Sequence, residues 1–153
     1  MKTAEYLGMA NRINRIIQNK LTDWQQFKES SLSVPSTENK ERVQSTMEPD
    51  KIGRIVAKID EMERDIDAKI DEYVKVKETI VSQITDISDE RYYGVLFSKY
   101  IENKRMEDMA SKMDFSFRYA KALHGEALQE FEKKYGEIYS KLDGINDMLQ
   151  ALR

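Results

Sequence analysis

The chain has 153 residues, of which 35% are charged and 40% are hydrophobic, and its net charge is -3 at pH 7. That length fits one domain, and a mean hydropathy of -0.70 predicts elongated helices more than a thick globular core. With no Cys and a single His, the sequence excludes a disulfide framework and a His/Cys zinc site.

The sequence also lacks the patterns of membrane and catalytic proteins. No apolar run approaches the roughly 20 residues of a membrane span, and the first residues lack the apolar segment of a signal peptide. We find no nucleophile elbow, phosphate loop or metal-ligand cluster. We therefore expect no enzyme activity, no cofactor, no metal and no membrane partner, and we expect the protein in the cytoplasm.

Residues 1–87 predict a long helical hairpin that resembles a coiled coil. Apolar residues recur three and four apart over 3–30 and again over 50–87, so two amphipathic helices would pack along matching stripes. A membrane-surface role for the first helix is the alternative. The stretch between them is Ser-rich and contains Pro35, which predicts a partly mobile connection at about 31–49. The acidic face of the second helix favours a solvated surface over a divalent-cation site.

Residues 88–131 predict a helix-turn-helix unit. Ser88, followed by two acidic residues, is typical of the cap of a helix over 89–101. A helix-turn-helix template that begins at Met106 places Ala110 where a small residue lets two helices approach, and places Ser116 as the cap of the second helix. Asp114 stands at the turn position that usually holds Gly. The remaining small or apolar template positions are Met109, Met113, Phe115, Ala120 and Leu123.

These residues resemble segments of two known groups of proteins. The segment from Ser116 to Phe131 resembles the recognition helix of region 4 of primary sigma factors, with a Ser cap and a closing Ala-Leu pair. The span from Lys2 to about Phe131 is similar to an uncharacterised phage and prophage protein family of Gram-positive bacteria. The shared features are Arg42-Val-Gln-Ser45, Lys99-Tyr-Ile101 and the segment Leu123 to Leu128. The resemblance implies a phage transcription regulator in a bacterial host cell.

A motif of this kind would present one set of side chains to DNA bases and another to phosphates. Arg118 is the best candidate for a bidentate contact to guanine. The base-reading candidates are Phe117, Arg118, Lys121, Ala122 and His124. The phosphate candidates are Lys99, Lys104, Arg105, Lys112 and Ser116. For His124, partial packing is the alternative to a base contact or a pH switch.

Residues 132–153 predict an amphipathic helix that continues the heptad spacing of the preceding segment. Its apolar positions are Leu128, Phe131, Tyr135, Ile138, Leu142, Ile145, Leu149 and Leu152. Because Gly136 and Gly144 lower its intrinsic stability, this helix needs a partner. It would either pair with a second copy as a homodimer or fold back on the hairpin.

The sequence therefore predicts an all-α protein that binds double-stranded DNA as a transcription regulator, with RNA polymerase as a further possible partner. Two alternatives stay open. One is a packaging adaptor, because small terminase subunits also join a helix-turn-helix to assembly helices. The other is a helical protein-interaction module with a degenerate helix-turn-helix.

Overall fold

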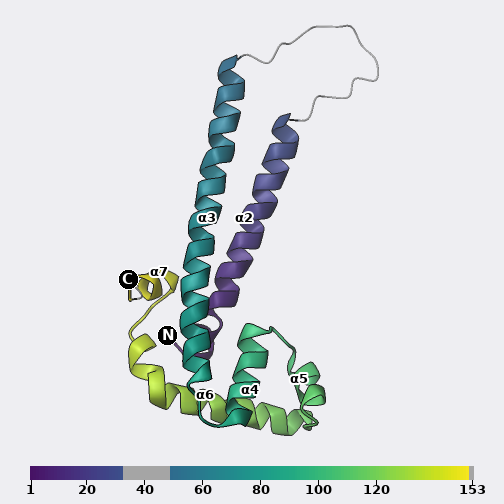
Figure 1. Ribbon diagram of the computed structural model, residues 1–153, viewed down its shortest axis with the longest axis vertical. Helices are drawn as coiled ribbons and strands as arrows, with labels where there is room; N and C mark the ends of the chain where they lie inside the picture. Colours follow the sequence, from purple (N-terminus) through teal and green to yellow (C-terminus); the bar gives the residue numbers. More distant parts are fainter. Residues whose placement is uncertain (33–48, 152–153) are drawn as a thin grey trace. The chain divides into compact units, whose positions relative to one another are not determined.

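The computed structural model describes residues 1–32 and 49–151 of the chain. Every regular element in these ranges is a helix and none is a strand, which confirms the predicted all-α class (Figure 1). The predicted connection at 31–49 lies almost wholly outside the described residues, and so do Arg42–Ser45 and Leu152.

The long helices begin and end close to the predicted positions. The first predicted helix is divided in two, α1 (Thr3–Leu7) and α2 (Met9–Leu32), with Gly8 between them. Gly is a poor helix former, and an added Cβ at Gly8 would lie only 3.2 Å from the carbonyl oxygen of Ala4. The second helix, α3, runs without interruption over Pro49–Thr85.

The chain divides into two compact units that share α2 and α3. One unit combines Met1–Asn14 with Asp71–Arg153, and the other consists of Arg15–Ile70. The predicted boundary at 87/88 therefore does not coincide with a boundary between compact units. The last turns of α3 belong to the unit that also holds the predicted helix-turn-helix segment.

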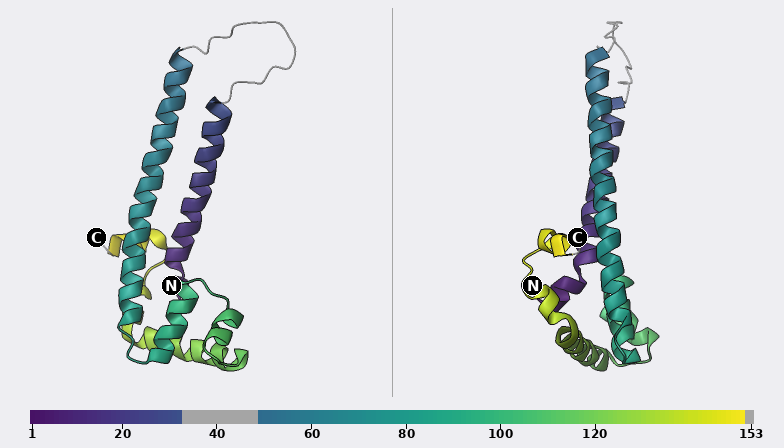
Figure 2. Two further views of the ribbon diagram at one scale, coloured as in Figure 1. Left: turned by 45° about the vertical axis from the view of Figure 1, so that its right-hand side comes forward. Right: turned by 60° about the vertical axis from the view of Figure 1, so that its left-hand side comes forward.

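In the unit formed by Arg15–Ile70, α2 and α3 lie side by side and run in opposite directions (Figures 1 and 2). An ion pair joins Lys20 of α2 to Asp65 of α3. Ile17 and Ile66 are buried, whereas several other apolar side chains of these helices remain exposed. A pair of helices covers only one stripe of each, so this unit keeps apolar surface in contact with water.

The other unit holds most of the buried side chains. Helices α4 (Glu90–Leu96) and α5 (Met106–Lys112) pack against α6 (Phe117–Tyr139), as Figure 1 shows. Its buried apolar residues include Leu7 and Ile13 from the start of the chain, Val76, Ile80 and Ile84 from α3, and Leu96, Leu123 and Phe131 from the later helices. These positions fix the helix-turn-helix segment on a core drawn from both ends of the sequence.

The second half of α6 packs on the start of the same chain. The rings of Tyr6 and Tyr139 stack with their centroids 4.4 Å apart, and the Tyr139 hydroxyl donates to Oγ1 of Thr3 at 2.9 Å. The ring centroid of Phe131 lies 6.2 Å from that of Tyr6. In the described residues, this part of the heptad seam is therefore covered by the chain itself.

The predicted single helix to the C-terminus is wrong, because the described residues contain two helices there. α6 ends at Tyr139 and α7 covers Ile145–Ala151. A carboxylate oxygen of Asp147 accepts the backbone N–H of Asp143 at 2.9 Å, which favours a new helix start at this point. Gly144 lies in the break, where its low helix propensity costs nothing.

Candidate nucleic-acid interface

The helix predicted over 89–101 consists of two different elements. α4 is capped by Asp89, whose side chain accepts the backbone N–H of Arg91 at 2.9 Å, so the cap is Asp89 and not Ser88. From Phe97 to Ile101 the chain forms a π-helix, η1. A π-turn widens the helix by one residue per turn and changes which side chains point inward. Ser98 and Tyr100 are buried here.

The end of η1 is held by the beginning of α2. Nδ2 of Asn11 donates to the carbonyl oxygen of Tyr100 at 2.8 Å, and Oδ1 of Asn11 accepts from Nδ2 of Asn103 at 3.0 Å. Asn103 has a φ of 57°, a left-handed conformation that Asn tolerates better than most residues. No periodicity in the sequence indicates this contact, because its partners lie about ninety residues apart.

A tight turn joins α5 to α6 as the template predicts. The backbone N–H of Phe115 donates to the carbonyl of Ala110 at 2.8 Å, and that of Asp114 donates to the carbonyl of Ser111 at 3.3 Å. Asp114 has a φ of 56°. These two bonds and the left-handed residue between them form a Schellman motif, which satisfies carbonyl groups at the end of α5.

The turn rests on a small apolar cluster formed by Val95, Met109 and Leu123, one from each of α4, α5 and α6. Ala110 is 3% exposed, which agrees with the expectation of a small residue at a close approach of helices. An added Cβ at Gly94 would lie 2.9 Å from Cε of Met113. The cluster is completed by partly buried side chains, Tyr92, Met106, Met113 and Phe115.

Helix α6 begins at the predicted cap. Oγ of Ser116 accepts the backbone N–H of Tyr119 at 3.1 Å. The buried face of the helix then follows from helical spacing and consists of Ala120, Leu123, Ala127 and Phe131.

The opposite face of α6 is exposed and carries four of the five base-reading candidates, Phe117, Arg118, Lys121 and Ala122. Gly125 lies one turn further along this face, and an added Cβ there would meet no atom within 4 Å. The exposed face therefore combines two cationic side chains with two positions that present little or no side chain.

His124 does not belong to this exposed face. Its Nε2 lies 3.1 Å from the Tyr100 hydroxyl, and the two rings are stacked with centroids 5.8 Å apart. Burial lowers the pKa of His124, and the charge of Lys99 lowers it further. Burial raises the pKa of Tyr100 to about 12. The neutral imidazole thus packs against a protonated tyrosine, which places His124 in the packing role that the sequence left as an alternative.

The five phosphate candidates lie in four places. Lys99 is half-buried on η1, while Arg105 is exposed at the first residue before α5. Lys104 is paired with Glu102 at 2.9 Å. The neighbouring ammonium group of Lys104 lowers the pKa of Lys112, because two like charges lie close together. Ser116 already uses its hydroxyl as a helix cap. The structure therefore brings Lys104 and Lys112 together and keeps Lys99 beside His124.

Two further polar contacts flank the exposed face. Nη1 of Arg91 donates to the Tyr119 hydroxyl at 3.3 Å, while its Nη2 pairs with Asp89 at 3.0 Å. The Tyr92 hydroxyl donates to a carboxylate oxygen of Glu126 at 3.1 Å. The sequence did not indicate Arg91 as a neighbour of α6, because the two residues in contact lie 28 positions apart.

Comparison with known proteins identifies no relative: no family model, curated protein or solved structure matches the chain. Among residues 1–32 and 49–151, no helix is long and apolar enough to cross a membrane. The same ranges contain no group of three or more His, Cys, Asp or Glu side chains that could hold a metal ion.

Proposed function

We propose that the chain is a phage-derived transcription regulator that binds double-stranded DNA through the first three turns of α6. The observation that carries the proposal is the exposed face of this helix, where Arg118 and Lys121 stand beside Ala122 and Gly125. The helix is capped at its start, and its other face packs on α4 and α5. A cationic helix supported in this way matches the requirements of a recognition helix.

The small residues on this face favour close contact with DNA. A major groove about 12 Å wide admits one helix, and short side chains allow the helix backbone to approach the base edges. Arg118 would then reach guanine, while Lys121 would reach a base or a neighbouring phosphate. Lys104 and Lys112, which lie together, would contact a phosphate and fix the register.

The charge balance of this region implies modest affinity for one copy. Residues 99–121 contain six basic and four acidic side chains, and Glu102 is already paired with Lys104. Binding should therefore weaken strongly with salt, with a slope of about -0.9 in log K for each phosphate contact. A second protein, such as RNA polymerase, or a second copy of the chain would raise the affinity.

Fluorescence anisotropy with a labelled duplex of mixed sequence, at several salt concentrations, tests the proposal. We expect binding at low salt and a loss of about 1–3 kcal/mol for Arg118→Ala in a specific site. Lys133→Ala is the matched control, because Lys133 is highly exposed on the same helix but lies beyond the proposed contact face. Absence of binding at low salt, or equal effects of the two variants, would contradict the proposal.

A protein-interaction role is the second candidate, and exposed aromatic side chains favour it. Phe117 is 49% exposed and Tyr119 is 41% exposed at the start of α6. Aromatic side chains are frequent anchors of protein interfaces. If Phe117 contacts a protein, Phe117→Ala should leave salt-dependent DNA binding largely intact. Pull-down with purified RNA polymerase should then recover less polymerase with this variant than with the unaltered chain.

A further inference from the structure

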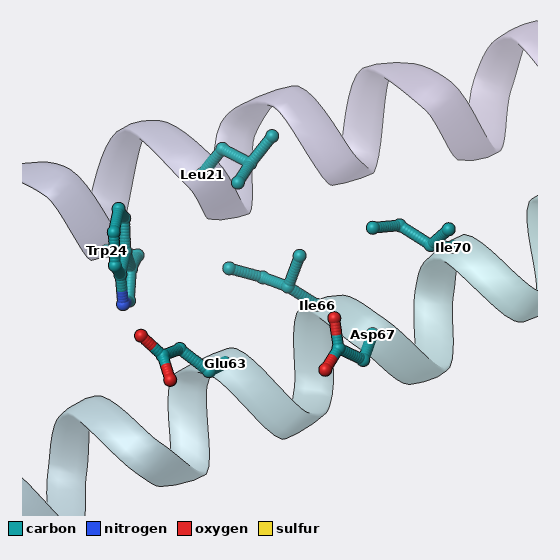
Figure 3. A pocket seen from close by; sticks show the side chains of 6 residues that line it. All are labelled: Leu21, Trp24, Glu63, Ile66, Asp67 and Ile70. Carbon is teal, nitrogen blue, oxygen red and sulfur yellow. The ribbon is translucent and has the colours of Figure 1, made fainter.

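The unit Arg15–Ile70 contains a pocket of about 300 Å³ between α2 and α3 (Figure 3). Its apolar walls come from both helices, and two carboxylates line it from α3, as Figure 3 shows. The lining residues are Leu21, Trp24, Glu63, Ile66, Asp67 and Ile70. Nε1 of Trp24 is shielded from water and has no hydrogen-bond partner among the described residues. The pocket is therefore mainly apolar, with two carboxylates at its edge and one shielded indole N–H that lacks a hydrogen-bond partner among the described residues.

The first three turns of α3 are basic and expose aliphatic side chains, whereas the edge of the pocket is acidic. Ile52 is 45% exposed and Val56 is 49% exposed, although both are aliphatic. Residues 49–58 contain three basic side chains, Lys51, Arg54 and Lys58, and one acidic side chain. Residues 60–67 contain five acidic side chains and one basic side chain. The charge of this helix thus changes sign within about three turns.

The exposed aliphatic positions and the two pocket carboxylates lie on one face of α3, and Lys51 and Lys58, seven residues apart, lie together beside that face. Ile52, Val56, Glu63, Asp67 and Ile70 are separated by 4, 7, 4 and 3 residues, which are helical spacings for a single face. This face includes the pocket edge at one end and exposed aliphatic side chains at the other. A rotation by 180° about an axis near Ile59 would place each end against the opposite end of an identical helix.

We propose that the Arg15–Ile70 unit associates with the same unit of a second copy, with the two α3 helices antiparallel. Ile52 and Val56 of one copy would cover the pocket of the other, while the basic segment 49–58 would lie against the acidic segment 60–67. A second copy fits because both halves of the surface are present on the same helix, as an isologous two-fold contact requires. The result is a four-helix arrangement that removes exposed aliphatic side chains from water.

This contact is independent of the proposed DNA contact, since it uses none of the residues of η1, α5 or α6. It also differs from the dimer predicted through the C-terminal seam, part of which packs on Tyr6 and Thr3.

Charge exchange tests the antiparallel contact by sedimentation equilibrium at low salt. The first variant combines Lys51→Glu with Lys58→Glu, and the second combines Glu63→Lys with Asp67→Lys. Each variant alone should dissociate at least tenfold more readily than the unaltered dimer, because like charges then face each other. An equimolar mixture of the two variants should form a heterodimer, and a chain that carries all four substitutions should dimerise again.

The single-pair variants separate antiparallel from parallel association. In a parallel pair, each segment would face its own copy and like charges would already face each other in the unaltered protein, so neither pair of substitutions alone would weaken the dimer. Circular dichroism of each variant establishes that helix content is retained, and Lys133→Glu on α6 serves as a charge-reversal control. A monomeric unaltered protein, a dimer insensitive to both pairs of substitutions, or a monomeric four-fold variant with full helix content would overturn the proposal.

Discussion

The backbone N–H of Phe115 donates a hydrogen bond to the carbonyl oxygen of Ala110, 2.8 Å away, and closes the turn between α5 and α6. The bond spans a left-handed residue, Asp114, so the geometry of the proposed DNA contact depends on one unusual backbone conformation. A non-Gly residue in this conformation carries a steric cost, which Asp bears more easily than a branched side chain.

Asp114→Gly should therefore stabilise the protein by up to about 1 kcal/mol, because Gly adopts this conformation without a steric cost. Urea unfolding followed by circular dichroism measures the change. Asp114→Ala is the control, since it removes the same carboxylate but keeps a Cβ, and it should not stabilise the protein. An equal change in stability in Asp114→Gly and Asp114→Ala would show that loss of the charge is the cause, which would contradict the conformational explanation.

Gly125→Ala should raise the free energy of unfolding by about 1 kcal/mol, because Ala is the better helix former. An added Cβ at this position meets no atom within 4 Å, so no steric cost opposes the gain. Gly94→Ala is the matched comparison within another helix, where the added Cβ would lie 2.9 Å from Cε of Met113. Thermal unfolding should show a clear gain at Gly125 and a smaller gain or a loss at Gly94.

The stability of the protein should fall as the pH decreases below about 6.5, because the pKa of His124 is lowered in the folded state. The unfolded chain takes up the proton first, so protonation favours unfolding between the unfolded and folded pKa values. Above the unfolded pKa, His124 is neutral in both states and the effect is absent. Urea midpoints at pH 7.5 and 5.5 should differ less in His124→Gln than in the unaltered protein, and an equal difference would exclude His124 as the cause.

Tyr139→Phe should destabilise the protein by about 1 kcal/mol, because it removes the bond to Thr3 and leaves a buried hydroxyl without its partner. The stacking of the aromatic ring on Tyr6 would remain in this variant. The additional substitution Thr3→Val should recover part of the loss, since both polar partners are then absent. Denaturant unfolding of the single and double variants measures this coupling, and strictly additive losses would argue against a direct bond.

Local signals account for the part of the fold that the sequence predicted. The bounds of α3 follow from Pro49 and from a sustained apolar period, and the start of α6 follows from Ser116. The turn at Asp114 could also be predicted, because the residue itself and its immediate neighbours determine its left-handed conformation.

Contacts between distant residues account for what the sequence did not predict. The bond from Asn11 to the carbonyl of Tyr100 links segments about ninety residues apart, and periodicity contains no information about it. The break after Tyr139 was missed because a heptad pattern continues through it, while Tyr139 packs against Tyr6 and Asp147 caps a new helix start. His124 satisfied a base-reading template although its environment is set by Tyr100.

A titration of isotope-labelled protein with a short DNA duplex, followed by amide chemical shifts, tests directly whether α6 contacts DNA. We expect shift changes at low salt to concentrate at Arg105, in the turn around Asp114 and along residues 116–125, and to disappear at high salt. Arg118→Ala should weaken these changes without altering the spectrum of the free protein elsewhere. No shift changes at low salt, or changes confined to residues outside 99–125, would contradict DNA binding through α6.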